Sequence, residues 1–166
     1  MLNCWYLEKE FLKSVNEHQG ILFKICRMYC KDNDDVNDLF QDMLLQLWQA
    51  WPTFKGASKL TTWMYRICLN TAIARLRKSN RSPALQSITL AQYGVPDTVP
   101  QRLDILFDAE LQAAIEGLDR IDKALIMLYL DEKSYKEIAE IMGLSETNVG
   151  VKLNRIKTKL KERMGA

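Results

Sequence analysis

An apolar repeat of helical spacing over residues 34–51 is the feature that most limits the folds open to this chain. Its members recur every three or four residues for more than four turns, so they share one face of a helix. They are Val36, Leu39, Phe40, Met43, Leu44, Leu47, Trp48 and Trp51. Asn33 and Asp34 stand where the N-cap of this helix is expected. No apolar–polar alternation of useful length occurs anywhere in the chain, so the sequence predicts an all-α fold.

The same spacing predicts two further helices before residue 80, at about residues 7–30 and 61–78. The first of these is expected to be interrupted near Gly20. Residues 52–58, PTFKGAS, contain proline, glycine and serine, which favour a loop. These elements are expected to form a first helical domain over residues 1–80.

A segment with little periodicity follows this domain. Residues 79–101 contain three prolines and a glycine, and they are too long for an ordinary connection inside a compact domain. Helical spacing returns over residues 102–164. The sequence therefore predicts two small helical domains, the second over residues 106–166, joined by a flexible linker over residues 81–105.

The charges of the chain are divided into blocks, although 23 basic and 21 acidic residues leave a net charge of only +2. Residues 51–81 hold seven basic residues and no acidic one, and residues 143–166 hold six basic and two acidic residues. An acidic block precedes each of them, with eight acidic and five basic residues over 1–50 and ten acidic and five basic residues over 101–142. Two separate basic segments indicate two contacts with nucleic acid.

The second basic block belongs to a predicted helix-turn-helix. Ser134 and Glu137 fit a capping box at the start of a helix over about residues 135–142. Gly143 can take the left-handed conformation that ends this helix. Ser145 is the expected N-cap of the next helix, which continues to about Arg163. A helix, a short glycine turn and a second helix form the arrangement with which many proteins read duplex DNA.

The second helix of this motif has two unlike faces. One face is apolar and suits a core, with Val149, Leu153, Ile156 and Leu160. The opposite face carries side chains that can bond to base edges or meet a thymine methyl group, namely Thr147, Val151, Asn154, Arg155 and Thr158. Flanking lysines could neutralise phosphates: Lys152, Lys157, Lys159 and Lys161. The alternative is a solvated amphipathic helix of a bundle, but the capping box, the glycine turn and the basic helix together favour DNA binding.

The first basic block interleaves its cations with aromatic side chains. Basic residues can follow a nucleic-acid backbone while aromatic rings stack on exposed bases, so this composition indicates a single-strand platform. The aromatic members are Trp51, Phe54, Trp63 and Tyr65. Trp51 and Phe54 could equally belong to the core, and for Trp51 the core is the favoured interpretation.

Leu45 falls on the face of the residue 34–51 helix that lies opposite the apolar repeat. Its neighbours on that face are polar or acidic: Asp38, Gln41, Asp42, Gln46 and Gln49. An apolar side chain within a polar ring can anchor a partner protein.

Two stretches of the chain resemble a known family. Residues 38–78 read DLFQDMLLQLWQAWPTFKGASKLTTWMYRICLNTAIARLRK and resemble the second region of bacterial sigma factors. Residues 118–162 read LDRIDKALIMLYLDEKSYKEIAEIMGLSETNVGVKLNRIKTKLKE and resemble their fourth region. A short chain with a bare linker in place of a third domain is similar to the extracytoplasmic-function (ECF) group of sigma factors.

This resemblance implies a role for three sets of residues. One set corresponds to the helix that docks on the clamp coiled coil of core RNA polymerase: Asp38, Gln41, Asp42, Leu45, Gln46 and Gln49. A second corresponds to the element that melts the −10 box and holds a flipped non-template base: Lys55, Lys59, Thr62, Trp63, Arg66, Asn70, Arg75, Arg77 and Lys78. A third corresponds to positions that read the −35 box as duplex DNA: Thr147, Asn148, Gly150, Val151, Lys152, Asn154, Arg155 and Lys159.

The chain departs from the family pattern at two positions. Members often carry an acidic residue where this chain has Ala74, and a basic one where it has Gly150. A glycine inside the reading helix weakens it by roughly 1 kcal/mol relative to alanine. It could also let the backbone approach DNA closely, so the base preference of the family does not transfer to this position.

The resemblance implies a sigma factor whose partners are core RNA polymerase, promoter DNA and an anti-sigma factor. The alternative is a free-standing helix-turn-helix regulator that binds a palindromic duplex as a dimer, without polymerase. An enzyme is not expected, because the chain shows no paired catalytic carboxylates, no Ser/His/Asp set and no glycine-rich phosphate loop.

Four cysteines complete the sequence pattern: Cys4, Cys26, Cys30 and Cys68. The N-terminus lacks the features of a secretory signal, so a cytoplasmic chain with reduced cysteines is expected. The cysteines then act as small buried apolar residues. With His18 as the one histidine, no metal site and no cofactor are expected. The chain contains no run of about 18 apolar residues, the length needed to cross a membrane.

Overall fold

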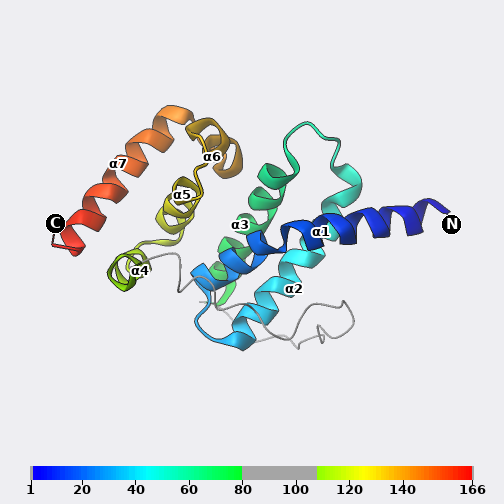
Figure 1. Ribbon diagram of the computed structural model, residues 1–166, viewed down its shortest axis with the longest axis horizontal. Helices are drawn as coiled ribbons and strands as arrows, with labels where there is room; N and C mark the ends of the chain where they lie inside the picture. Colours follow the sequence, from blue (N-terminus) through cyan, green and yellow to red (C-terminus); the bar gives the residue numbers. More distant parts are fainter. Residues whose placement is uncertain (1, 80–107, 166) are drawn as a thin grey trace. The chain divides into compact units, whose positions relative to one another are not determined.

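The computed structural model describes residues 2–79 and 108–165, which contain helices and no strand (Figure 1). The chain divides into two compact units, Met1–Val95 and Pro96–Ala166. This confirms the all-α prediction with two small helical domains. The predicted linker over 81–105 lies wholly outside the described residues, as do the first two positions of the second domain predicted over 106–166.

The first unit packs three helices against one another: α1 (Leu2–Tyr29), α2 (Asn33–Ala50) and α3 (Leu60–Ser79). A short 3-10 helix, η1 (Trp51–Thr53), follows α2 and leads into the loop expected there. Where the helices meet, their apolar side chains are fully or almost fully buried: Leu22, Ile25, Val36, Phe40, Met43, Leu47, Met64 and Leu69. The apolar face predicted for α2 therefore contributes Val36, Leu39, Phe40, Met43 and Leu47 to the core of this unit, whereas Leu44 and Trp51 are half-buried and Trp48 is 38% exposed.

The N-cap of α2 differs from the sequence prediction. Asp32 caps α2, because its backbone is extended (φ −101°, ψ 160°) and its Oδ1 accepts a hydrogen bond from the Asp35 N–H at 2.8 Å. Asn33 and Asp34 lie within the first turn instead. The interruption of α1 predicted near Gly20 is confirmed, and it lies at His18 (φ −120°, ψ 15°). There the His18 Nδ1–H donates to the Ser14 carbonyl at 2.9 Å.

Burial accounts for the described cysteines. Cys26 and Cys68 are fully buried and Cys30 is half-buried, and all three are free thiols. Burial raises the pKa of all three thiols, that of Cys30 to about 11. Thiolates are the reactive form, so these cysteines are unreactive near neutral pH. The prediction of small buried apolar residues is thus confirmed for Cys26 and Cys68.

The second unit contains α4 (Ala109–Glu116), α5 (Arg120–Leu130), α6 (Tyr135–Met142) and α7 (Glu146–Arg163). Helix α7 contacts each of the other three. It also supplies a cap, because Arg163 Nη1 donates to the carbonyl of Ala114 in the last turn of α4 at 3.0 Å. Cations at a helix C-terminus satisfy free carbonyls in this way.

The helix-turn-helix forms as the sequence predicts. Ser134 Oγ accepts from the Glu137 N–H at 3.2 Å, and Glu137 Oε2 accepts from the Ser134 N–H at 2.9 Å, which completes the capping box. Gly143 ends α6 in the left-handed region (φ 67°), and Ser145 caps α7 by accepting from the Asn148 N–H at 3.1 Å. Within the two described ranges, no helix is long and apolar enough to cross a membrane.

Candidate functional site

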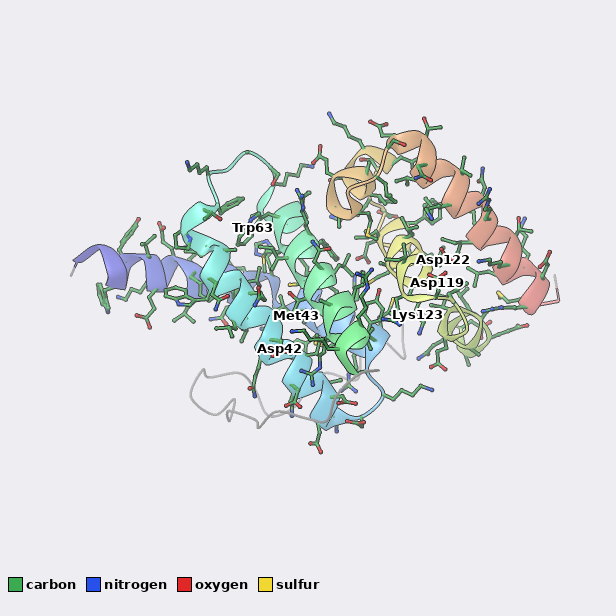
Figure 2. The ribbon with its side chains drawn as sticks, turned by 180° about the vertical axis from the view of Figure 1, so that it is seen from behind. Asp42, Met43, Trp63, Asp119, Asp122 and Lys123 are labelled. Atoms are coloured by element: carbon green, nitrogen blue, oxygen red, sulfur yellow. The ribbon has the colours of Figure 1, made fainter. Side chains whose placement is uncertain are left out.

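The outward side of α2 combines one exposed leucine with polar and acidic side chains. Leu45 is 52% exposed, whereas Leu47 is buried in the core. Asp42 and Met43 are adjacent in sequence, yet Met43 is fully buried and Asp42 is half-exposed (Figure 2). We call this surface the docking face and define it by the residues that the resemblance assigns to polymerase binding: Asp38, Gln41, Asp42, Leu45, Gln46 and Gln49. All six have side chains that are at least partly exposed.

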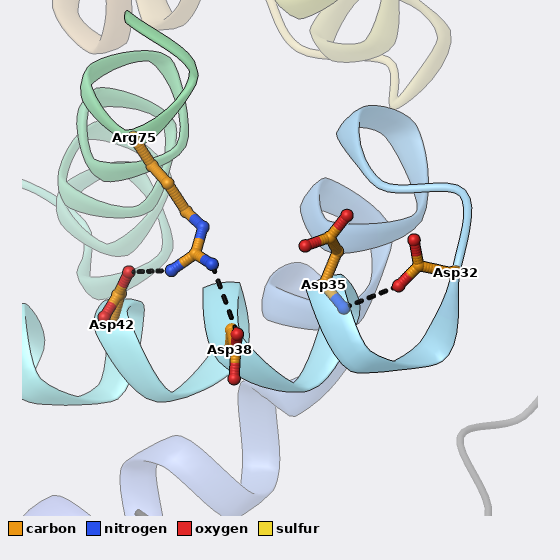
Figure 3. A network of polar contacts seen from close by, with 5 residues as sticks. All are labelled: Asp32, Asp35, Asp38, Asp42 and Arg75. Carbon is orange, nitrogen blue, oxygen red and sulfur yellow. Dashed lines mark hydrogen bonds and ion pairs between the residues drawn. The ribbon is translucent and has the colours of Figure 1, made fainter. Parts of the chain in front are cut away.

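A basic residue from α3 joins the docking face. Arg75 Nη1 donates to Asp42 Oδ2 at 2.5 Å, and Arg75 Nη2 donates to Asp38 Oδ2 at 3.4 Å (Figure 3). Partial burial lowers the pKa of Arg75, but the hydrogen bond and the charge of Asp42, together with Asp38, raise it more, and the net shift is upward. Arg75 is therefore a charged partner of α2 in this structure.

Aromatic side chains gather where α1, α2 and α3 meet the loop after η1. Phe54 and Trp63 have ring centroids 4.9 Å apart, and both rings also contact Trp51, at 6.1 and 6.0 Å. On its other side Trp51 contacts Phe11 at 5.5 Å. Trp51, Phe54 and Trp63 are each half-buried. Trp51 is thus held against α1 but is not fully enclosed, and the cluster leaves aromatic surface accessible beside basic residues.

The open side of α3 continues from this cluster. Arg66, Asn70 and Arg77 are exposed and lie within about 60° of one another around the helix. Lys55, Lys59 and Lys78 are also exposed. We call this surface the single-strand face and define it as Lys55, Lys59, Trp63, Arg66, Asn70, Arg77 and Lys78.

The two faces of α7 are separated as the spacing predicts. Val149, Leu153, Ile156 and Leu160 are buried, at most 7% exposed. Six of the residues predicted to read the −35 box are exposed: Thr147, Asn148, Val151, Asn154, Arg155 and Lys159. Val151 is 45% exposed, although it is apolar. A helix that presents amide, guanidinium, hydroxyl and methyl groups on one side has the chemistry of a major-groove reader.

Two family models match this chain: Sigma-70 region 2 over residues 15–82 and Sigma-70, region 4 over residues 108–160. The ECF RNA polymerase sigma-E factor of Escherichia coli (strain K12) is 28% identical over 146 residues, which cover 81% of this chain and 76% of that protein. The chain belongs to the ECF sigma factors of the sigma-70 family. It is therefore an RNA polymerase sigma factor.

Other comparisons agree with this assignment. The RNA polymerase sigma factor SigV of Bacillus subtilis (strain 168) is 25% identical over 142 residues, which cover 85% of this chain and 82% of that protein. The fold is similar to that of the sigma factor RpoE from Bartonella quintana, solved in complex with the anti-sigma factor NepR. The TM-score is 0.70 at 22% identity, and the match covers 95% of this chain and 98% of that chain. CnrH, solved in complex with the cytosolic domain of CnrY, has a TM-score of 0.64, 22% identity and coverage of 93% and 87%.

Two residues assigned to the −10 contact by resemblance lie elsewhere in this sigma factor. Thr62 is buried, at 5% exposed, because its side chain turns into the core of the first unit. Arg75 lies about 140° around α3 from Asn70, on the flank that meets α2. Neither side chain lies on the single-strand face. The angular separation of Arg75 from Asn70 was the signal in the sequence that could have shown this.

Lys159, assigned to the −35 contact, also has a partner inside its own unit. Its Nζ lies 3.0 Å from Asp122 Oδ2. Asp122 is 8% exposed and lies in the first turn of α5, next to the N-cap Asp119, which accepts from the Ile121 and Asp122 N–H groups (Figure 2). A buried carboxylate needs such a partner. Lys157 likewise lies over the Tyr129 ring, 3.9 Å from its centroid.

We expect Lys159→Met to destabilise the second unit by about 1–2 kcal/mol, because it leaves the Asp122 carboxylate buried without its cation. Hydrogen exchange of the α5 and α7 amides measures this loss. Lys161→Met is the matched control, since Lys161 is exposed on the same helix, and it should change the exchange little. Unchanged protection in Lys159→Met, with a salt slope of duplex binding lower by about one, would instead support a phosphate contact.

Gly150 lies in the interior of α7 and faces the start of α6. A Cβ atom added at Gly150 would lie 3.4 Å from Cε2 of Tyr135, which is an ordinary contact distance. Tyr135 is therefore a neighbour of the predicted DNA-reading helix that the sequence analysis did not single out.

We expect Gly150→Ala to stabilise α7 by about 0.5–1 kcal/mol, because alanine has the higher helix propensity and its methyl group fits against Tyr135. Hydrogen exchange of the α7 amides should slow accordingly. Val151→Ile serves as the comparison, since it changes an exposed neighbour on the same helix to a residue of similar helix propensity. Faster exchange in Gly150→Ala would mean that Tyr135 cannot accommodate the methyl group.

The described ranges 2–79 and 108–165 contain no group of three or more His, Cys, Asp or Glu side chains placed to hold a metal ion.

Proposed function

We propose that this sigma factor binds core RNA polymerase through the docking face, reads the −35 box with α7 and opens the −10 box with the single-strand face. The observation that carries the proposal is the chemical difference between three exposed surfaces. One combines acids with a lone leucine, one combines cations with half-buried aromatic rings, and one is the outward side of a helix-turn-helix. Each surface suits a different target: a protein, unpaired bases and duplex DNA.

The docking face suits a protein partner that is basic around an apolar contact. Leu45 offers an apolar anchor at the centre, and the two carboxylates of Asp38 and Asp42, which share the single cation Arg75, leave a net negative charge on its N-terminal side. Charge complementarity speeds association and selects the partner, while an apolar anchor that becomes buried on binding supplies most of the affinity. The resemblance to sigma factors supports the clamp coiled coil of core polymerase as this partner.

The single-strand face suits a melted strand. Arg66, Arg77 and Lys78 can follow the phosphates, while Trp63, held by Phe54 and Trp51, presents a ring on which a base can stack. Stacking of a base on an aromatic side chain contributes about 1–3 kcal/mol. That is comparable to the cost of unstacking one base, so capture of a flipped base offsets the opening of the duplex.

The outward side of α7 suits the −35 box in duplex form. Asn154 and Arg155 can form paired hydrogen bonds with the edges of adenine and guanine, and Val151 can contact a thymine methyl group. Asn148 and Thr147 lie in the first turn of the helix, the part of a recognition helix that enters the groove first. Lys152 is half-buried beside them and can reach a phosphate.

The sigma factor performs no bond chemistry in this proposal, because nucleotide addition belongs to the polymerase. We also propose that an anti-sigma factor holds the protein inactive. The support is that RpoE and CnrH, whose folds this chain shares, were solved with the anti-sigma factor NepR and with the cytosolic domain of CnrY.

The opening step can be followed with promoter duplexes that carry the fluorescent base 2-aminopurine in the −10 box. Fluorescence should rise when core polymerase and the sigma factor are both present, and neither protein alone should produce the rise. Trp63→Ala should reduce it at saturating protein. An equal rise with the sigma factor alone, or a rise that Trp63→Ala leaves unchanged, would contradict the assignment of opening to the single-strand face.

A further inference from the structure

Arg75 lies between two carboxylates of the docking face. It reaches them from α3, and its two Nη atoms bind Oδ2 of Asp42 and Oδ2 of Asp38 (Figure 3). The planar guanidinium is suited to this bridging role, since its donors form a rigid fork that a lysine cannot reproduce. Both of these hydrogen bonds end on Oδ2 atoms, and none of those described joins Arg75 to the Oδ1 atom of either aspartate.

The two carboxylates need such a bridge. Asp38 and Asp42 are four residues apart on α2, a spacing at which like charges repel each other. Without a cation between them, their side chains would turn apart toward water. Arg75 therefore defines the direction in which both carboxylates point.

The exposure of the three side chains indicates what this bridge contributes. Arg75 is 32% exposed, Asp38 36% and Asp42 47%. Ion pairs as exposed as these add little to the stability of a fold. They do, however, restrict the side chains that a partner must meet, and a surface already ordered before binding loses less entropy on association.

We propose that Arg75 is a positioning residue of the docking face, which holds the Asp38 and Asp42 carboxylates in the orientation that core RNA polymerase binds. This proposal rests on the proposed function of that face. It differs from the sequence-based assignment of Arg75 to −10 DNA, because Arg75 lies on a different side of α3 from Asn70 of the single-strand face.

Arg75→Met is the direct test, because methionine keeps part of the packing of the arginine stem while it removes the charge and the fork. We expect the affinity of the full chain for core polymerase to fall by about tenfold, an amount typical of losing order in an interface. Arg75→Lys retains the charge without the fork, so its affinity for core polymerase should lie between that of the unchanged chain and that of Arg75→Met. Hydrogen exchange of the α2 and α3 amides should stay unchanged.

Arg77→Met is the matched control, since it removes an arginine from the same helix on the single-strand face. It should leave the affinity for core polymerase unchanged and weaken binding to single-stranded DNA. Arg75→Met should show the opposite pattern. Unchanged polymerase affinity in Arg75→Met, or a loss of DNA binding in its place, would overturn the proposal.

A double-mutant cycle separates positioning from a direct contact. In a chain that also carries Asp38→Asn and Asp42→Asn, Arg75→Met should cause no further loss of polymerase affinity, because its effect passes through those carboxylates. A loss of the same size in both backgrounds would overturn the proposal. If Leu45→Arg leaves polymerase binding intact, the docking face itself is wrong, which is a different result from an Arg75 variant that binds normally.

Discussion

Replacing Leu45 with arginine should weaken binding to core RNA polymerase by about a hundredfold or more. The substitution removes the apolar anchor at the centre of the docking face and places a cation where we propose a basic partner. Both effects act in the same direction, and like charges across an interface cost several kcal/mol. The fold should persist, because Leu45 is 52% exposed and contributes little to the core.

Leu12→Arg is the matched control for this variant. Leu12 is also an exposed leucine of the first unit, at 38%, but it lies on α1 outside the docking face. Titration of fluorescently labelled chain with core polymerase should therefore show near-normal binding for Leu12→Arg and a large loss for Leu45→Arg. Equal affinity of the two variants would show that polymerase binds another surface.

The second large effect is expected at Arg155. Arg155→Ala should cost about 1–3 kcal/mol on the preferred −35 sequence and relax the preference at one or two base pairs. The reason is that an arginine on the outward face of α7 can bond to two acceptors of a guanine at once. Arg155 is exposed and lies next to Asn154 on that face, so its loss should disturb neither the core nor the caps of α7.

Binding to a set of duplexes with single changes in the −35 box measures this effect, at several salt concentrations. Lys161→Ala, on the same helix, should weaken binding evenly across the set if it weakens it at all. An even loss for Arg155→Ala, together with a lower salt slope, would mean that Arg155 contacts phosphate and reads no base.

Sequence reasoning succeeded where the determining contacts are local. The capping box of Ser134 and Glu137, the left-handed Gly143 and the cap Ser145 are each separated from their partners by a few residues. Their chemistry therefore defines α6 and α7 without knowledge of the rest of the chain. The apolar repeat of α2 likewise shows which side of the helix is buried, and the exposure of Leu45 follows from its position opposite that repeat.

Sequence reasoning did not reveal the distant partners of polar side chains. Arg75 binds Asp42 and Lys159 binds Asp122 across 33 and 37 residues of sequence. Within a basic segment, the sequence does not distinguish a cation that pairs with a carboxylate of the protein from a cation that can contact DNA. Only the packing of α3 on α2, and of α7 on α5, distinguishes them. Burial of Thr62 has the same origin, since a hydroxyl near a helix start can face either way.

Transcription with purified components tests the proposed function most directly. Core RNA polymerase should be assayed on a library of promoter fragments, alone and with this sigma factor, and the start points of the transcripts mapped. We predict transcripts from a defined subset of fragments that share a −35 and −10 pair, and their loss with Leu45→Arg. The contradicting result is a sigma factor that binds duplex DNA tightly by itself and yields no promoter-directed transcript, as a free-standing helix-turn-helix regulator would.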